Sequence, residues 1–146
     1  MRLTPPKMMP PIGTLEKLIG CLGIDNDTHV VLVVTGRGAG EMASATRVYW
    51  TFKALGHDKV SILDGGLVAY AQDRKNPLDN KINKPSPKTF KANLRPDYFV
   101  TAEQLHELLD DGISLVDSRS RGEHMGLLSG GGKERPGTIP GSVNLP

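Results

Sequence analysis

Apolar and polar residues alternate along the chain in blocks that predict short strands and amphipathic helices. Apolar residues recur at helical spacing over 14–22, over 42–55 and from Thr101 to Gly112, and a short helix is expected to begin over 67–71. Thr101 and Gln104 predict a capping box at the start of the helix that ends at Gly112. Continuous apolar runs predict buried strands over 30–34, 60–63 and 113–116. Because strands alternate with helices, the pattern predicts an α/β fold with a mainly parallel sheet.

Two stretches interrupt this alternation. Residues 1–13 are rich in proline and predict a flexible arm. Residues 73–97 are polar, basic and proline-containing, so they predict a linker or a segment wrapped over the surface. The structured parts of the chain are then expected to span 14–72 and 98–146.

Composition and charge narrow the class of protein. The chain has 146 residues, of which 38% are hydrophobic, and a net charge of +2 with both signs mixed along it. This balance indicates neither a nucleic-acid partner nor a membrane partner. The run over 30–34 is far too short to cross a bilayer, and the first residues contain no apolar signal region, so we expect a cytoplasmic protein.

The chain has one cysteine, Cys21, so an internal disulfide and a cysteine-based metal cluster are excluded. The four histidines lie without ligand spacing, and no cofactor or metal is expected, although a histidine–carboxylate site formed by the fold stays open. A nucleophilic cysteine must be exposed and lie in electropositive surroundings. Cys21 falls in an amphipathic helix without an adjacent histidine or arginine, which favours a partly buried structural residue.

The loop over 36–40 follows a predicted strand and precedes a predicted helix, a place where many proteins bind anions. Its glycines give G-x-G-x-G rather than G-x-G-x-x-G, and no lysine follows them as in a phosphate-binding Walker loop. Glu41 would also place a carboxylate beside any bound anion. A tight, mobile turn without a ligand is therefore the favoured interpretation, and nucleotide binding is the alternative.

The segment 117–123 follows the third predicted strand and is rich in charge. Asp117 and Arg119 could form an ion pair that shapes a pocket, because ligands of such sheets bind beyond the carboxyl ends of the strands. The ordinary polar end of a strand would have the same composition, so the sequence leaves both interpretations open.

Two longer stretches resemble the rhodanese family of sulfurtransferases. "RVYWTFKALGHDKVSILDGGLVAY", residues 47–70, resembles the second half of the first, non-catalytic domain of tandem rhodaneses. "LVDSRSRGEHMG" and "RPGTIPGSVNLP" resemble the first half of the second domain. The resemblance implies a rhodanese-like parallel sheet flanked by helices, incomplete or permuted. It assigns 14–72 and 98–146 to halves of two domains and 73–97 to the interdomain linker.

The family's mechanism, which the resemblance implies, passes sulfane sulfur from thiosulfate or 3-mercaptopyruvate through a cysteine persulfide to cyanide or a thiol. By resemblance, the residues that bind the donor are Asp117, Arg119 and Glu123. Some tandem members carry an arginine where this chain has Glu123, and Thr138 stands where the family often has histidine. Cys21 does not match the nucleophile, so no catalytic residue is assigned. The expected partner is a small anionic sulfur donor, and the oligomeric state is left open.

Two functions therefore remain. The first is a rhodanese-type sulfurtransferase that is truncated before the persulfide cysteine and inactive alone. The second is a catalytically silent rhodanese-like module that binds an anion or a partner. The two halves would either dock as one permuted domain, with 73–97 as the new connection, or stay apart.

Overall fold

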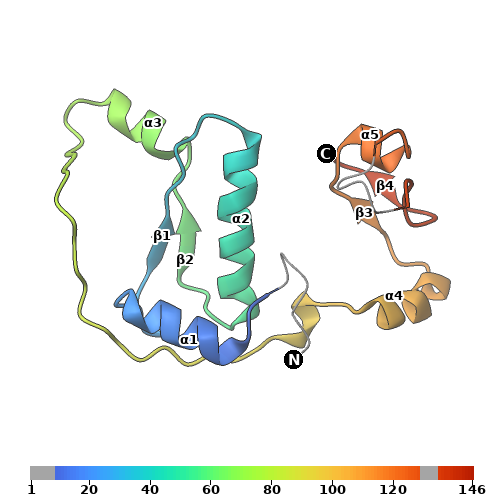
Figure 1. Ribbon diagram of the computed structural model, residues 1–146, viewed down its shortest axis with the longest axis horizontal. Helices are drawn as coiled ribbons and strands as arrows, with labels where there is room; N and C mark the ends of the chain where they lie inside the picture. Colours follow the sequence, from blue (N-terminus) through green and yellow to red (C-terminus); the bar gives the residue numbers. More distant parts are fainter. Residues whose placement is uncertain (1–8, 129–134) are drawn as a thin grey trace. The chain divides into compact units, whose positions relative to one another are not determined.

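The structure, a computed structural model, describes residues 9–128 and 135–146 (Figure 1). Most of the predicted proline-rich arm, and the glycine-rich stretch 129–134, lie outside the described residues. The chain divides after Phe99 into two compact units, one over residues 1–99 and one over 100–146.

Unit 1 is built on a pair of parallel strands, β1 (Val30–Leu32) and β2 (Val60–Ile62), with Val30 opposite Val60 and Leu32 opposite Ile62. The long helix α2 (Ala39–Ala54) joins them and packs beside the sheet (Figure 1). The remaining elements of the unit are α1 (Ile12–Cys21), α3 (Gly66–Gln72) and the short 3₁₀ helix η1 (Pro96–Tyr98).

The hydrophobic core of unit 1 joins four parts of the chain. Its buried side chains come from α1, from the end of α2, from β2 and from the segment after residue 85, and they are Leu15, Ile19, Phe52, Leu55, Val60 and Phe90. Burial of apolar surface of this kind is the main stabilising contribution to folding. The helical stripe predicted over 42–55 is confirmed for Ala45, Phe52 and Leu55, whereas Val48 is exposed.

Residues 86–99, the second half of the predicted linker 73–97 and the two residues after it, pack against the rest of unit 1. Phe90 is only 2% exposed, so this segment supplies a core residue. The Lys88 amide donates to the Gly20 carbonyl at 2.9 Å, and the Arg95 amide donates to the Ala54 carbonyl at 2.9 Å. Arg95 also pairs with Asp58 through two hydrogen bonds of 2.9 and 2.5 Å. This part of the segment is a surface wrap that helps to close the core.

Unit 2 holds a second parallel pair, β3 (Val116–Asp117) with β4 (Val143–Asn144). Its helices are α4 (Ala102–Leu108), the 3₁₀ turn η2 (Leu109–Asp111) and α5 (Arg121–His124). The predicted capping box of α4 is confirmed: the Gln104 amide donates to Thr101 Oγ1 at 3.2 Å, and the Thr101 amide donates to Gln104 Oε1 at 2.9 Å. The expected α/β class with parallel strands is also confirmed.

The prediction of a buried strand is wrong for 30–34 and for 113–116, whereas β2 has no exposed residue. Val31 and Val33 are 53% and 55% exposed and alternate with the partly buried Leu32. Among the described residues each sheet has two strands, and the alternating exposure along β1 indicates that one of its faces is uncovered. The third strand begins at Val116 rather than at 113, and Val116 is exposed.

Candidate functional site

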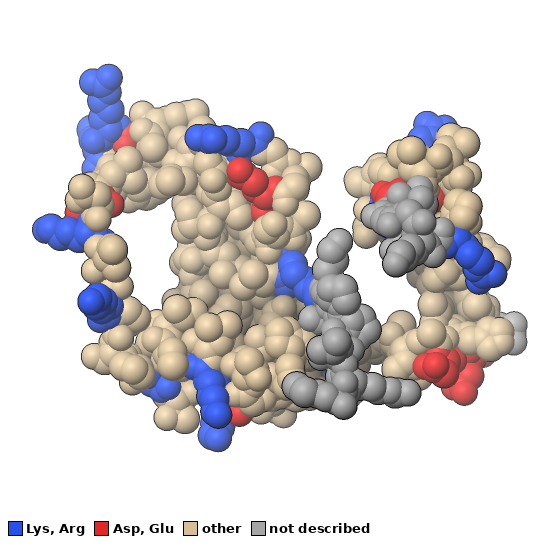
Figure 2. Space-filling view, viewed as in Figure 1, with Lys and Arg blue, Asp and Glu red and all other residues tan. Residues whose placement is uncertain are grey.

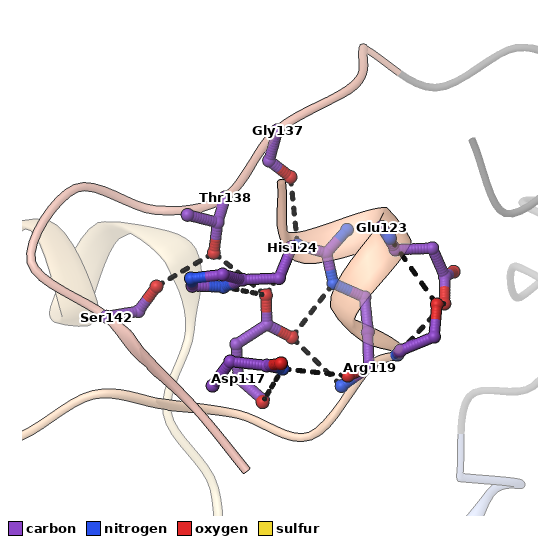
Figure 3. Close-up of polar contacts among 9 residues, drawn as sticks. Asp117, Arg119, Glu123, His124, Gly137, Thr138 and Ser142 are labelled. Atoms are coloured by element: carbon purple, nitrogen blue, oxygen red, sulfur yellow. Dashed lines mark hydrogen bonds and ion pairs between the residues drawn. The ribbon is translucent and has the colours of Figure 1, made fainter. Parts of the chain in front are cut away.

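The side chain of Asp117, at the carboxyl end of β3, is the centre of a polar cluster in unit 2 (Figure 3). Its Oδ1 atom accepts hydrogen bonds from the Arg119 amide and from Arg119 Nε, both at 3.0 Å. Its Oδ2 atom accepts from Arg119 Nη2 at 2.7 Å and from Thr138 Oγ1 at 2.8 Å, and His124 Nδ1 lies 3.1 Å away. The Asp117 side chain is only 8% exposed, so these partners replace most of its water.

The guanidinium group of Arg119 connects the strand end to a distant loop. Besides its two bonds to Asp117, Nη2 donates to the Gly137 carbonyl at 2.9 Å. Asn144 on β4 donates its side-chain amide to the Asp117 and Arg119 carbonyls, each at 2.9 Å. Two carboxylate oxygens bonded to one planar fork make a strong and geometrically specific pair. The cluster therefore clamps the 137–144 segment against the end of β3.

The hydrogen bond from Arg119 is the main reason that the pKa of Asp117 lies well below its ordinary value. The backbone amide of Arg119 and the Thr138 hydroxyl lower the pKa further. A carboxylate that is ionised and bonded to this many donors is a poor proton acceptor. Asp117 is consequently suited to hold the loop in place rather than to act as a general base.

A cavity of about 900 Å³ opens beside this cluster. Its lining combines apolar residues with two cationic residues, Arg119 and Arg135, and one anionic residue, Asp117. The lining is completed by Leu115, Val116, Ser118, Pro136, Gly137, Thr138, Ile139, Pro140 and Ser142. The Asp117 carboxylate is paired with Arg119, so Arg135 gives the lining a net positive charge, which favours a small anion. Concave sites with a few convergent polar groups are typical ligand sites.

The three residues expected at the donor site fall into two groups. Asp117 and Arg119 line the cavity, whereas Glu123 is not among its lining residues. Glu123 closes a capping box on α5, where its Oε2 atom accepts from the Ser120 amide at 3.1 Å and from Ser120 Oγ at 2.6 Å. The hydroxyl of Ser120 is the main cause that lowers the pKa of Glu123. Its part in donor binding stays a prediction.

The sequence did not predict that Arg135 and Thr138 line the cavity. Arg135 lines the cavity from a loop with neither helix nor strand, so no periodic pattern marks it. Thr138 entered only as a departure from the family, yet its hydroxyl donates to Asp117 and lies 2.8 Å from Ser142 Oγ. The basic residue directly before "PGTIPG" was the one signal available for this side of the cavity.

In the glycine loop over 36–40 of unit 1, backbone amides donate hydrogen bonds to a carboxylate of the same chain. Glu41 Oε2 accepts from the Gly36 amide at 2.8 Å and from the Arg37 amide at 3.1 Å. Glu41 lies in the first turn of α2, where a negative charge is favourable. The loop donors that an external anion would use therefore already bind a carboxylate, which agrees with the interpretation of a turn without a ligand.

The expectation that Cys21 is partly buried is wrong, because this residue is exposed at the last position of α1. The inward face of α1 carries Leu15 and Ile19, and Cys21 lies off that face. Within residues 9–128 and 135–146, no group of three or more His, Cys, Asp or Glu side chains is placed to bind a metal ion. Over the same residues, no helix combines the length and the apolar character that a membrane span requires.

Comparison with known proteins gives the class to which this arrangement belongs. The chain matches no protein-family model. It is 38% identical over 147 residues to thiosulfate sulfurtransferase from Bos taurus, covering 95% of this chain and 47% of that protein. It is also 38% identical over 143 residues to human 3-mercaptopyruvate sulfurtransferase, covering 95% of this chain and 46% of that protein.

Comparison with solved structures gives the same class of protein. SseA from Escherichia coli, described as a 3-mercaptopyruvate sulfotransferase with the rhodanese fold, superposes with a TM-score of 0.75 at 26% identity, over 98% of this chain and 52% of that one. Tum1 from Saccharomyces cerevisiae gives a TM-score of 0.72 at 25% identity, over 98% of this chain and 49% of that one. Parallel strands, flanking helices and a cavity at a strand end thus define an α/β chain with the rhodanese fold.

The chain has the rhodanese fold and is homologous to thiosulfate and 3-mercaptopyruvate sulfurtransferases. It spans about half the length of the curated relatives that it matches.

Proposed function

We propose that this chain provides the donor-binding side of a rhodanese-type sulfurtransferase. The observation that carries the proposal is the cavity of about 900 Å³ that Arg119 and Arg135 both line, in a chain homologous to sulfurtransferases. The donor would be thiosulfate or 3-mercaptopyruvate, whose negative charge suits the guanidinium group of Arg135 beside the Asp117–Arg119 pair. The acceptor would be cyanide or a thiol.

The reaction requires a thiolate. Its sulfur attacks the sulfane sulfur of thiosulfate, the S–S bond breaks, and sulfite leaves with the electron pair. Cyanide then attacks the outer sulfur of the enzyme persulfide, which yields thiocyanate and regenerates the thiolate. In this scheme, the clamp of Asp117 and Arg119 holds the cavity wall, and Arg135 attracts the donor.

The 146 residues contain one thiol, that of Cys21. It lies on α1 of unit 1, outside the residues that line the cavity. We therefore propose that the 146-residue chain alone is inactive and that the persulfide cysteine has to come from elsewhere. A cytoplasmic location stays a prediction.

The second candidate is a catalytically silent module that binds an anion or a partner. The absence of a cysteine from residues 22–146 favours it, because the cavity is then an anion site without a nucleophile. Under this alternative, anion binding is the function and sulfur transfer never occurs.

The first experiment is thiosulfate:cyanide sulfur transfer by the purified chain and by its Cys21→Ser variant, with thiosulfate binding measured by calorimetry on the same samples. We expect saturable thiosulfate binding and no transfer by either protein. Transfer that disappears in Cys21→Ser would make Cys21 the nucleophile and refute the proposed inactivity. Absence of both binding and transfer would refute the donor site itself.

To separate the two candidates, a polypeptide that supplies a rhodanese cysteine loop can be added to the chain. Restored transfer would support the sulfurtransferase. Unchanged anion binding with no transfer would favour the silent module.

A further inference from the structure

Residues 74–84 of unit 1 form an extended basic segment, called the strap here, between α3 and the wrapped segment that begins near residue 86 (Figure 1). It contains neither helix nor strand, and every residue in it except Asn76 is exposed. Within the described part of the chain, residues 78–87 make no backbone–backbone hydrogen bond. Both ends of the strap are held, by α3 on one side and by Lys88 and Phe90 on the other.

Two large aliphatic residues of this strap are mostly exposed to solvent. Ile82 is 86% exposed and Leu78 is 64% exposed. Exposure of this degree places almost all of the Ile82 side chain in water, at a cost that an apolar partner surface would relieve. At about 3.3 Å per residue for an extended chain, the two residues lie at most roughly 13 Å apart, within reach of two pockets of one groove.

The charge of the strap is strongly positive. Four basic residues, Arg74, Lys75, Lys81 and Lys84, stand against one acidic residue, Asp79, so its formal charge of +3 exceeds the +2 of the whole chain. Lys and Arg side chains extend outward along this edge of the unit in the space-filling view (Figure 2). The Lys81–Asp79 contact, at 3.9 Å between highly exposed groups, neutralises little of this charge.

We propose that the strap is a docking segment for a partner protein that offers an apolar groove with an acidic rim. Leu78 and Ile82 would enter the groove, and Lys81 and Lys84 would meet carboxylates at its edge. The inference stands apart from sulfur transfer, because it uses none of the residues that line the cavity.

Two other classes of partner fit the strap less well. Residues 74–84 contain no aromatic side chain, so the strap has no platform on which nucleic-acid bases would stack. Membrane-surface binding generally uses a helix with a continuous apolar face, whereas the strap is extended and has two aliphatic side chains.

The test selects binders from a displayed library of random short peptides on the full chain. We expect the enriched peptides to combine aspartate or glutamate with aliphatic or aromatic residues. Their dissociation constants should rise at least about tenfold for Leu78→Ser/Ile82→Ser and for Lys81→Glu/Lys84→Glu, as for central contacts of an interface. Salt should weaken the wild-type binding.

The matched control is Leu22→Ser, which removes another exposed leucine of unit 1 from outside the strap. It should bind the selected peptides as the wild type does. Circular dichroism should show that all variants keep their fold, since the replaced side chains are exposed. Equal losses in the control and the strap variants, or selected peptides without acidic residues, would overturn the proposal.

Two direct binding measurements complete the test. Binding of a single-stranded oligonucleotide that is lost in Lys81→Glu/Lys84→Glu, with no acidic peptide selected, would assign the strap to nucleic acid. Strap-dependent binding to vesicles of phosphatidylcholine and phosphatidylserine, again without acidic peptides, would assign it to a membrane surface. Either result would refute a protein partner.

Discussion

Helix α1 contains two glycines whose replacement by alanine should have opposite effects. A Cβ atom built at Gly20 would lie 2.4 Å from the Lys88 carbonyl oxygen and 3.5 Å from the Lys88 carbonyl carbon, whereas nothing lies within 4 Å of a Cβ atom at Gly13. Real Cβ atoms do not approach backbone to 2.4 Å, so Gly20→Ala must displace the wrapped segment. Gly13→Ala displaces nothing and makes a matched control in the same helix.

The expected changes in the free energy of unfolding follow from the open space at Gly13 and the crowding at Gly20. Alanine in place of glycine favours a helix by about 0.5–1 kcal/mol, so Gly13→Ala should raise the free energy of unfolding by up to that amount. At Gly20 the same gain is opposed by overpacking of about 1–3 kcal/mol. The hydrogen bond from the Lys88 amide to the Gly20 carbonyl, of about 1 kcal/mol, is also strained or lost. We expect Gly20→Ala to lower the free energy of unfolding by about 1–3 kcal/mol.

Urea unfolding measures both variants. Trp50 is the only tryptophan, and its ring packs edge-on against Phe99 with the ring centroids 5.0 Å apart, so its fluorescence reports on unit 1. The midpoint should fall by roughly 1 M in Gly20→Ala, for a slope of about 1–3 kcal/mol per M, and should stay equal or rise in Gly13→Ala. A Gly20→Ala midpoint at or above that of the wild type would refute the close packing of residues 86–99 on α1.

The remaining predictions concern the two loops and the cavity. Glu41→Gln removes the charged acceptor of two loop amides and should lower the free energy of unfolding of unit 1 by about 1 kcal/mol in the same urea assay; an unchanged midpoint would contradict the contact. Arg135→Ala should weaken thiosulfate binding at least about tenfold in calorimetry, whereas Arg74→Ala, which lies in unit 1, should not; equal effects would argue against a site in the cavity. Asp117→Asn should lower the hydrogen-exchange protection of the Val143 and Leu145 amides, which bond to carbonyls in and beside β3, and unchanged protection would contradict the clamp. The pKa of Asp117 is lower in the folded chain than in the unfolded one. The stabilising contribution of Asp117 is therefore fully present above about pH 4, and it is lost as the pH falls toward and through the pKa of the folded chain. We expect the hydrogen-exchange protection of these amides to decrease on acidification.

Local sequence signals determined much of the secondary structure. The capping box at Thr101 and the helix over 42–55 depend on residues within a few positions of one another, and both are present in the structure. Local signals also determined the loop at 36–40. The sequence placed the Glu41 carboxylate beside any bound anion, and in the structure this carboxylate accepts a hydrogen bond from the Gly36 amide of the loop. The count of one cysteine is by itself enough to exclude an internal disulfide.

The charge pair at the end of β3 was partly visible in the sequence. Asp117 and Arg119 are two positions apart, so a fork between them could be anticipated from the residues alone. The other members of the clamp were not visible, because Thr138 and Asn144 reach Asp117 from more than twenty positions away. The strand β4 was missed for the same reason, since two residues carry no periodic signal without their partner.

Burial was the property that only the tertiary structure decided. A polar linker was expected to stay outside the core, yet Phe90 enters it and Gly20 is needed to make room for the adjacent backbone. Valines that suggested a strand buried on both faces are exposed on one, because burial depends on which layers cover a sheet. Composition and periodicity fix which elements form, whereas side-chain contacts between distant segments fix what they enclose, here a cavity lined by Arg119 and Arg135.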